Sequence, residues 1–126
     1  MLNKQEKQLI MVVENNEQIL FLTKEILEMN HYQVETFQDF LIALDYYKAN
    51  YTKVTALLLD MQLENKNDYL ITIPSFLDIS QNVPIIGMSG EITLKDIPEP
   101  IRLKITHFLR KPFEMKQLLD LLARIG

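Results

Sequence analysis

A short apolar run that ends at a single carboxylate places the strongest constraint on the fold of this 126-residue chain. Residues 54–59 read Val-Thr-Ala-Leu-Leu-Leu, and Asp60 follows directly. The run is too short to span a membrane, so it is typical of a strand that is buried on both faces of a parallel sheet. Asp60 then lies at the carboxyl end of that strand, where ligands bind in open α/β sheets. For an isolated aspartate, capping of the next turn is the plainer interpretation, and the other strands must decide.

Four further segments have the composition of strands. Residues 9–13 form a second continuous apolar run, and residues 83–88 form a third, with Pro84 near its start. Residues 33–37 alternate polar and apolar side chains, and residues 107–110 form a short strand before Lys111. Segments with helical periodicity or turn residues separate them. Because crossovers between parallel strands are right-handed, this order predicts an α/β fold with a five-stranded parallel sheet and helices on both faces.

The helices are predicted with different degrees of regularity. Residues 17–30 and 114–125 carry apolar side chains at helical spacing, and Asp39 is a suitable cap for a helix that follows it. In the first helix the expected buried stripe is Ile19, Leu22, Ile26 and Leu27, in the second it is Leu41, Ala43, Leu44 and Tyr47, and in the last it is Met115, Leu118, Leu119 and Leu122.

Prolines are expected to disturb the two remaining helices. Pro74 lies inside the segment 68–79, so we expect a kink or a late start there, because proline removes a hydrogen-bond donor and clashes with the preceding turn. Pro98 and Pro100 interrupt residues 91–103, which leaves one or two short turns.

Composition excludes several classes of protein. The chain has no cysteine, so it has no disulfides, no thiolate nucleophile and no thiolate-bound zinc. The net charge of −4 disfavours autonomous binding to nucleic acid or to an anionic membrane. The start of the chain resembles neither a signal peptide nor a transmembrane helix. We therefore expect a single domain over residues 1–126, located in the cytoplasm.

Polar residues at the strand ends form one candidate site. Glu14, Asn15, Asp60, Ser89 and Lys111 come from four strands and are expected to meet at one edge of the sheet. Carboxylate and amide oxygens suit Mg²⁺, which takes few protein ligands and keeps several waters. The lysine and the hydroxyl suit the oxygens of a phosphoryl group, and the aspartate is a competent nucleophile toward phosphorus.

Taken together, these segments resemble a response-regulator receiver domain over essentially the whole chain. The matching pieces are Val12-Val13-Glu14-Asn15, Leu57-Leu58-Leu59-Asp60, Pro84-Ile85-Ile86-Gly87-Met88-Ser89-Gly90 and Phe108-Leu109-Arg110-Lys111-Pro112-Phe113. The resemblance implies a flavodoxin-like (βα)5 fold and a signalling switch of a two-component system rather than an enzyme. It also implies that Asp60 accepts phosphate from a histidine kinase or phosphotransfer protein.

The same resemblance implies roles for the other site residues. The candidate metal ligands for Mg²⁺ are Glu14, Asn15, Asp60 and Gln62. Ser89 and Lys111 bind the phosphoryl oxygens, and Ser89 and Phe108 reposition after phosphorylation, which alters a surface that a downstream protein partner reads. The Lys111–Pro112 bond is often cis in such proteins. Phe108 is equally well explained as a core residue.

Departures from the family pattern favour a second interpretation. The family usually has two carboxylates after the first strand, but the second is Asn15 here, which should weaken Mg²⁺ binding. The loop 61–68 lacks the usual proline and glycine, and Glu64 is either a compensating ligand or, more simply, a solvated charge. The alternative is thus a phosphate-independent pseudo-receiver that acts as a protein-interaction module. A homodimer through the last two helical segments is an option that the prolines there disfavour.

Two other classes fit the sequence less well. A haloacid-dehalogenase-like phosphohydrolase needs a second aspartate where this chain has Gln62, and no paired acidic motif follows Ser89. A nucleotide-binding protein needs a phosphate loop after the first strand, but Glu14-Asn15-Asn16-Glu17 is acidic and free of glycine. His31 and His107 do not form a metal pair and are expected at the surface or in satisfied positions.

Overall fold

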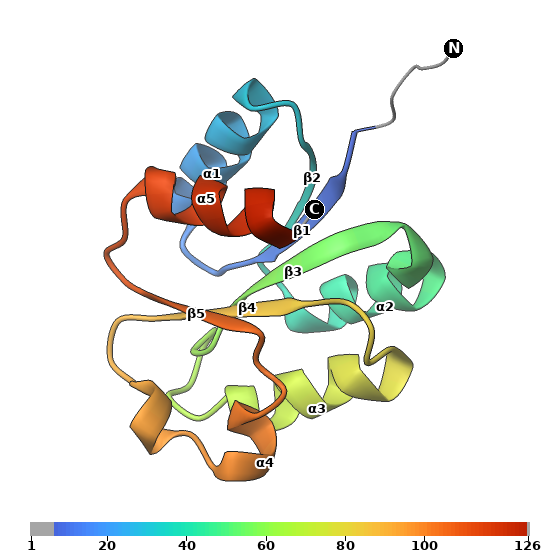
Figure 1. Ribbon diagram of the computed structural model, residues 1–126. Helices are drawn as coiled ribbons and strands as arrows, with labels where there is room; N and C mark the ends of the chain where they lie inside the picture. The colour runs from blue at the N-terminus through green and yellow to red at the C-terminus, as the bar shows by residue number, and fades with distance from the viewer. Residues whose placement is uncertain (1–6, 126) are drawn as a thin grey trace.

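A five-stranded parallel sheet between two layers of helices forms the protein in the computed structural model, which describes residues 7–125 (Figure 1). The strands are β1 (Leu9–Val13), β2 (Gln33–Phe37), β3 (Val54–Asp60), β4 (Ile85–Ser89) and β5 (His107–Arg110), in the spatial order β2-β1-β3-β4-β5. The helices are α1 (Glu17–Met29), α2 (Phe40–Asn50), α3 (Tyr69–Ile79), α4 (Glu99–Arg102) and α5 (Met115–Ile125), with 3₁₀ turns η1 (Tyr51–Lys53) and η2 (Leu94–Asp96). The predicted fold class is confirmed.

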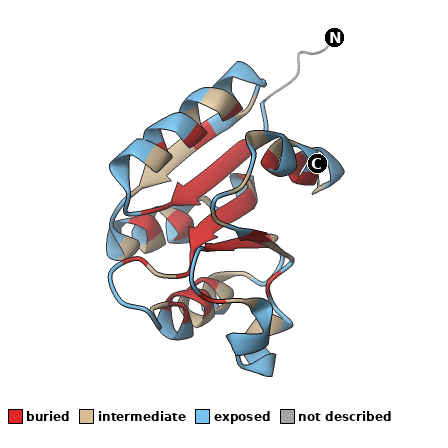
Figure 2. Cartoon of the chain, turned by 90° about the vertical axis from the view of Figure 1, so that its left-hand side faces the viewer, coloured by how far each residue is buried: buried red, intermediate tan, exposed pale blue. Residues whose placement is uncertain are grey.

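The central strands are apolar throughout because both of their faces are covered. Along β1, Met11 and Val13 belong to the core under α2, α3 and α4, whereas Ile10 and Val12 belong to the core under α1 and α5. In Figure 2 the central strands are buried along their length, while each helix shows an exposed outer face. This two-sided burial explains why the strands read as continuous hydrophobic runs instead of alternating ones.

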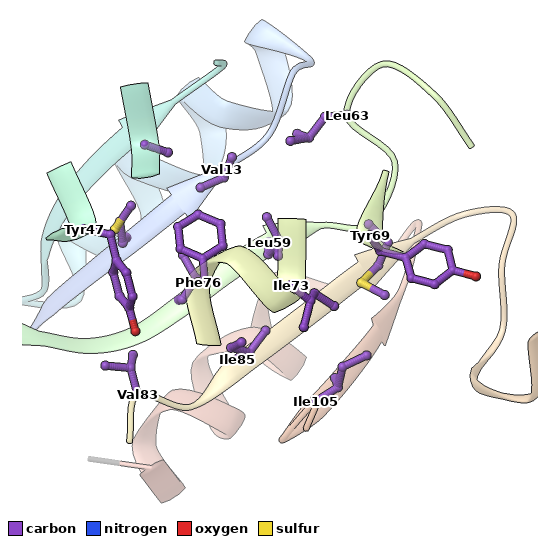
Figure 3. Close-up of a cluster of buried hydrophobic side chains, with 14 of the residues drawn as sticks. Val13, Tyr47, Leu59, Leu63, Tyr69, Ile73, Phe76, Val83, Ile85 and Ile105 are labelled. Atoms are coloured by element: carbon purple, nitrogen blue, oxygen red, sulfur yellow. The ribbon is translucent and has the colours of Figure 1, made fainter. Parts of the chain in front are cut away.

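Aromatic side chains fill the core between β3 and the helices α2 and α3 (Figure 3). The Phe76 ring makes edge-to-face contacts with the rings of Tyr47 and Phe40, at centroid distances of 5.1 and 5.7 Å. Such pairs add to the stabilisation that burial alone gives. Phe76 and Tyr47 are almost completely buried, so they fix α3 and α2 against each other.

Helix α3 does not start late at Pro74, as one form of the sequence prediction had it. It is assigned as helix from Tyr69 onward, so five helical residues precede the proline. Tyr69, Ile73 and Phe76 are buried on both sides of Pro74. Their packing offsets the hydrogen bond that proline removes, because most helix stability in a protein comes from tertiary contacts.

The buried face of α1 is also rotated relative to the predicted stripe. The helix buries Leu20, Thr23 and Leu27, whereas Leu22 is 53% exposed. In α2, Ala43 and Tyr47 are buried as expected but Leu41 is 67% exposed, and in α5 the buried residues are Leu118, Leu121 and Leu122.

Within residues 7–125, no helix is long and apolar enough to cross a membrane.

The segment between β4 and β5 contains little helix, as the prolines predicted. It consists of η2 and the four-residue helix α4, which starts directly after Pro98. Ile92 and Ile97 are buried and attach the segment to the core under α2, α3 and α4. The Lys111–Pro112 bond after β5 is cis, as the resemblance implied.

Removing the cap of α2 is expected to lower the free energy of unfolding by about 1 kcal/mol. An Asp39 side-chain oxygen accepts a hydrogen bond from the backbone N–H of Ile42 at 3.0 Å, which satisfies one of the free donors of the first turn. Urea denaturation of Asp39→Ala and Asp39→Asn measures this, and the asparagine variant should stay close to the wild type because it also caps well. Equal losses in both variants would contradict the capping role.

Candidate functional site

The polar residues predicted from the strand ends do lie at one edge of the sheet. Asp60 and Ser89 are the last residues of β3 and β4, and Glu14 and Lys111 directly follow β1 and β5. The register pairs Val13 with Leu59, Asp60 with Met88 and Ser89 with Arg110, so all four strands end at nearly the same level. The parallel topology thereby turns four distant positions in the sequence into one site.

Lys111 joins the two carboxylates of this site. Its Nζ lies 2.5 Å from an Oε atom of Glu14 and 3.3 Å from an Oδ atom of Asp60. Glu14 is 1% exposed and Asp60 is 4% exposed, so water screens these charges poorly. One ammonium therefore faces two buried carboxylates, and the cluster has an excess negative charge when both are ionised.

Asp60 is held in a strained electrostatic setting. Burial and, to a smaller extent, the charge of Glu14 raise the pKa of Asp60 to about 6, although the backbone N–H of Gln62 and the Lys111 ammonium act in the opposite direction. The Gln62 N–H donates to Asp60 Oδ1 at 2.9 Å. The anionic form of Asp60 is thus less favourable than in an ordinary aspartate. A bound cation, or a chemical modification of the carboxylate, would therefore relieve an unfavourable charge at this position.

Asn15 does not point its amide nitrogen at the carboxylates. The Asn15 Nδ2 group donates to the backbone carbonyl of Leu63, which ties the end of β1 to the loop 61–68. The backbone N–H of Asn16 donates to the second carboxylate oxygen of Glu14 at 3.0 Å. Asn15 is exposed and serves here as a bridge between two loops.

Gln62 and Ser89 are brought together, and a third residue joins them. The Ser89 hydroxyl donates to the Gln62 side-chain oxygen at 2.8 Å, and the Gln62 side-chain nitrogen donates to a Glu91 carboxylate oxygen at 3.1 Å. The side chain of Gln62, predicted as a metal ligand, is therefore occupied by Ser89 and Glu91, and its contact with Asp60 is through the backbone. Sequence reasoning missed Glu91, although it follows Ser89 by the same two positions by which Gln62 follows Asp60.

The remaining candidates lie apart from these contacts. Phe108 is half-buried in β5 and packs against the core under α2 and α3. Glu64 is exposed, and its backbone N–H donates to Asp68 in the loop 61–68. His31 lies in the turn between α1 and β2, and His107 starts β5, so the two histidines lie near opposite edges of the sheet.

The donor set determines which metal the site suits. Among residues 7–125, no three or more acidic or histidine side chains converge on one point. Glu14 and Asp60 supply two hard carboxylate oxygens, which fits a Mg²⁺ ion that keeps several of its waters better than a cation that needs an all-protein cage. Lys111 already neutralises part of the same charge, so a divalent ion has to share these carboxylates with it.

Comparison with known proteins agrees with this geometry. The family model of the response regulator receiver domain matches residues 10–123. The nisin biosynthesis regulatory protein NisR of Lactococcus lactis subsp. lactis is 32% identical over 109 residues, which is 86% of this chain and 46% of that protein. The chain thus spans about half the length of this curated relative.

Two solved structures illustrate the likeness in fold. The non-phosphorylated HemR receiver domain from Leptospira biflexa has a TM-score of 0.81 and 24% identity, covering 94% of each chain. A response regulator from Burkholderia pseudomallei with a phosphorylated aspartic acid and a calcium ion has a TM-score of 0.76 and 20% identity, covering 92% of this chain and 66% of that one.

Proposed function

The chain belongs to the response regulator receiver domain family, and from this premise we propose that it is a phospho-accepting switch of two-component signalling whose acceptor is Asp60. The observation that carries the proposal is the contact of Lys111 with both Glu14 and Asp60 at the end of the sheet. A buried aspartate with a raised pKa, paired with a lysine, is an arrangement suited to chemistry more than to stability.

The proposed reaction is transfer of a phosphoryl group from a phosphohistidine. A carboxylate oxygen of Asp60 forms a bond to phosphorus as the phosphorus–nitrogen bond of the donor breaks, and the departing imidazole takes its proton from solvent. The Lys111 ammonium offsets the negative charge of the phosphoryl oxygens, and the Ser89 hydroxyl donates a hydrogen bond to one of them. The buried surroundings of Asp60 keep these interactions strong.

Glu14 and Asp60 are the residues that we propose to hold Mg²⁺, with Asn15 as a weaker candidate. The ion supplies positive charge that reduces repulsion between the carboxylate and the incoming phosphoryl group. Affinity should be lower than in a site with a third carboxylate, because the amide of Asn15 brings no charge and its nitrogen is engaged with Leu63.

The proposed partners follow from the reaction. A histidine kinase or phosphotransfer protein donates the phosphate, and a downstream protein reads the surface near Ser89 and Phe108. We further propose that residues 1–126 form one receiver domain, that it acts in the cytoplasm, and that it works as a switch rather than as an enzyme. A homodimer is a weaker proposal, because α4 has only four residues to offer to such an interface.

A second function has one observation in its favour. The carboxylate set is short by one member, since Asn15 replaces a carboxylate and bonds to the loop instead. A receiver that has lost phosphotransfer and binds partners in the unmodified form would tolerate this change.

Intact mass after incubation with acetyl phosphate distinguishes the two functions. With Mg²⁺, the wild type is expected to gain the mass of one phosphoryl group, and EDTA should suppress this gain. Asp60→Asn should gain none while it keeps the circular dichroism spectrum of the wild type. A gain of equal size in Asp60→Asn would refute the acceptor assignment, and no gain in the wild type at any Mg²⁺ concentration would favour the phosphate-independent module.

A further inference from the structure

The hydroxyl of Ser89 is fully committed in the unmodified protein. It donates its one hydrogen to the Gln62 side-chain oxygen at 2.8 Å, and it accepts from the backbone N–H groups of Glu91 at 3.2 Å and Ile92 at 3.0 Å. A serine hydroxyl has one donor and two acceptor positions, so all three are used. Ser89 is also completely buried, so water cannot replace these hydrogen-bond partners while the side chain stays in this position.

Gln62 connects this hydroxyl to the acceptor residue. Its backbone N–H donates to Asp60, while its side-chain oxygen accepts from Ser89 and its side-chain nitrogen donates to the Glu91 carboxylate at 3.1 Å. The hydrogen bond to an ionised carboxylate is of the stronger, charge-assisted kind. Gln62 and Glu91 thereby close a bridge between the loops that follow β3 and β4.

We propose that Gln62 and Glu91 form a latch that holds the Ser89 hydroxyl and opposes its turn toward a phosphoryl group on Asp60. The proposal rests on the proposed function, because it assigns a regulatory role to neighbours of the same site. Ser89 has only one proton to donate, so it cannot serve the Gln62 oxygen and a phosphoryl oxygen at once. Glu91 acts indirectly, because its hydrogen bond holds the Gln62 amide in the position that engages Ser89.

The latch makes a prediction of definite sign for Gln62→Ala. This variant keeps the backbone N–H that contacts Asp60 but removes the side chain that holds Ser89. The experiment titrates each protein with beryllofluoride in the presence of Mg²⁺ and follows binding by ¹H–¹⁵N NMR. We expect the half-saturating beryllofluoride concentration of Gln62→Ala to be about 3- to 10-fold lower than that of the wild type, which corresponds to the free energy of one net hydrogen bond. If the Gln62 amide instead assisted phosphoryl binding, the variant would bind beryllofluoride more weakly.

Variants of Glu91 separate the latch from simple charge repulsion. Glu91→Ala removes the outer hydrogen bond and should lower the half-saturating concentration about 2- to 4-fold. Glu91→Gln removes the charge but keeps an oxygen that accepts from Gln62, so it should stay within about twofold of the wild type. Gln81→Ala, an exposed glutamine before β4, is the matched surface control and should leave binding unchanged.

The outcomes keep the latch and the proposed function apart. Tighter beryllofluoride binding by Gln62→Ala than by the wild type supports the latch. Binding by Gln62→Ala when the wild type shows none supports it as well. Binding by the wild type with equal or weaker binding by Gln62→Ala overturns the latch alone. No binding by the wild type or any variant overturns the proposed function and the latch together. In the unmodified protein, the side-chain NH₂ resonances of Gln62 should shift in Glu91→Ala, and their constancy would also overturn the latch.

Discussion

Replacing Lys111 by methionine is expected to lower the free energy of unfolding by about 2–4 kcal/mol at pH 7.5. The substitution keeps the length of the side chain but removes the ammonium that faces Glu14 and Asp60. Both carboxylates are buried, so bulk water cannot solvate the charges that the ammonium no longer neutralises. The expected loss lies somewhat below that of a fully buried pair because the Lys111 side chain is 20% exposed.

The size of this loss should depend on pH. Without the ammonium, one of the two carboxylates takes up a proton more readily, which limits the penalty at low pH. Urea denaturation of Lys111→Met and wild type at pH 5.0 and 7.5 tests this, and the difference between them should be smaller at pH 5.0. Lys104→Met, at an exposed lysine after α4, is the control and should change stability by less than about 0.5 kcal/mol.

A double variant tests whether the loss comes from the shared charge cluster. In Lys111→Met/Asp60→Asn only Glu14 remains charged, and its carboxylate keeps the hydrogen bond from the Asn16 backbone. We therefore expect Asp60→Asn to add more stability in the Lys111→Met background than it adds to the wild type, so that the two substitutions are not additive. Additive effects of the two single substitutions would show that Lys111 does not stabilise the fold through the charge of Asp60.

The strands and their order could be predicted because parallel sheets place both faces of each strand in the core. Residues 54–60 and 9–13 read as strands from composition alone, and their carboxyl ends had to meet once the topology was parallel. This is why Glu14, Asp60 and Ser89 could be placed together from the sequence. The register of the sheet then sets them at the same level.

The direction of the polar side chains could not be predicted in the same way. The amide of Asn15 bonds to Leu63 and that of Gln62 to Ser89 and Glu91, and these contacts depend on loop conformations that have no periodic pattern. The buried face of α1 was misplaced for a related reason. Thr23 lies on that face, and a pattern search that counts only apolar residues rotates the helix away from it.

Replacing Asp60 by asparagine is expected to raise the free energy of unfolding by about 1–3 kcal/mol at pH 7.5. Burial raises the pKa of Asp60 to about 6 from an ordinary value of 3.8, so ionised Asp60 is less favourable in the folded chain than in the unfolded one. Asparagine has nearly the same shape, accepts the Gln62 N–H in the same way and no longer repels Glu14. The protein should thus gain stability as it loses its proposed phosphoryl acceptor.

The pH profile identifies the cause of this gain. Between about pH 4 and 6 the folded protein binds more protons at Asp60 than the unfolded chain does, so the Asp60 contribution to the free energy of unfolding falls as pH rises through this interval. Urea denaturation in EDTA should show wild type and Asp60→Asn close together near pH 4.5 and furthest apart above pH 7. Asp78→Asn, at an exposed site in α3, is the matched control and should show no such divergence. A constant difference between Asp60→Asn and wild type at all pH values would mean that shape or hydrogen bonding, and not the charge of the buried carboxylate, limits the stability of this site.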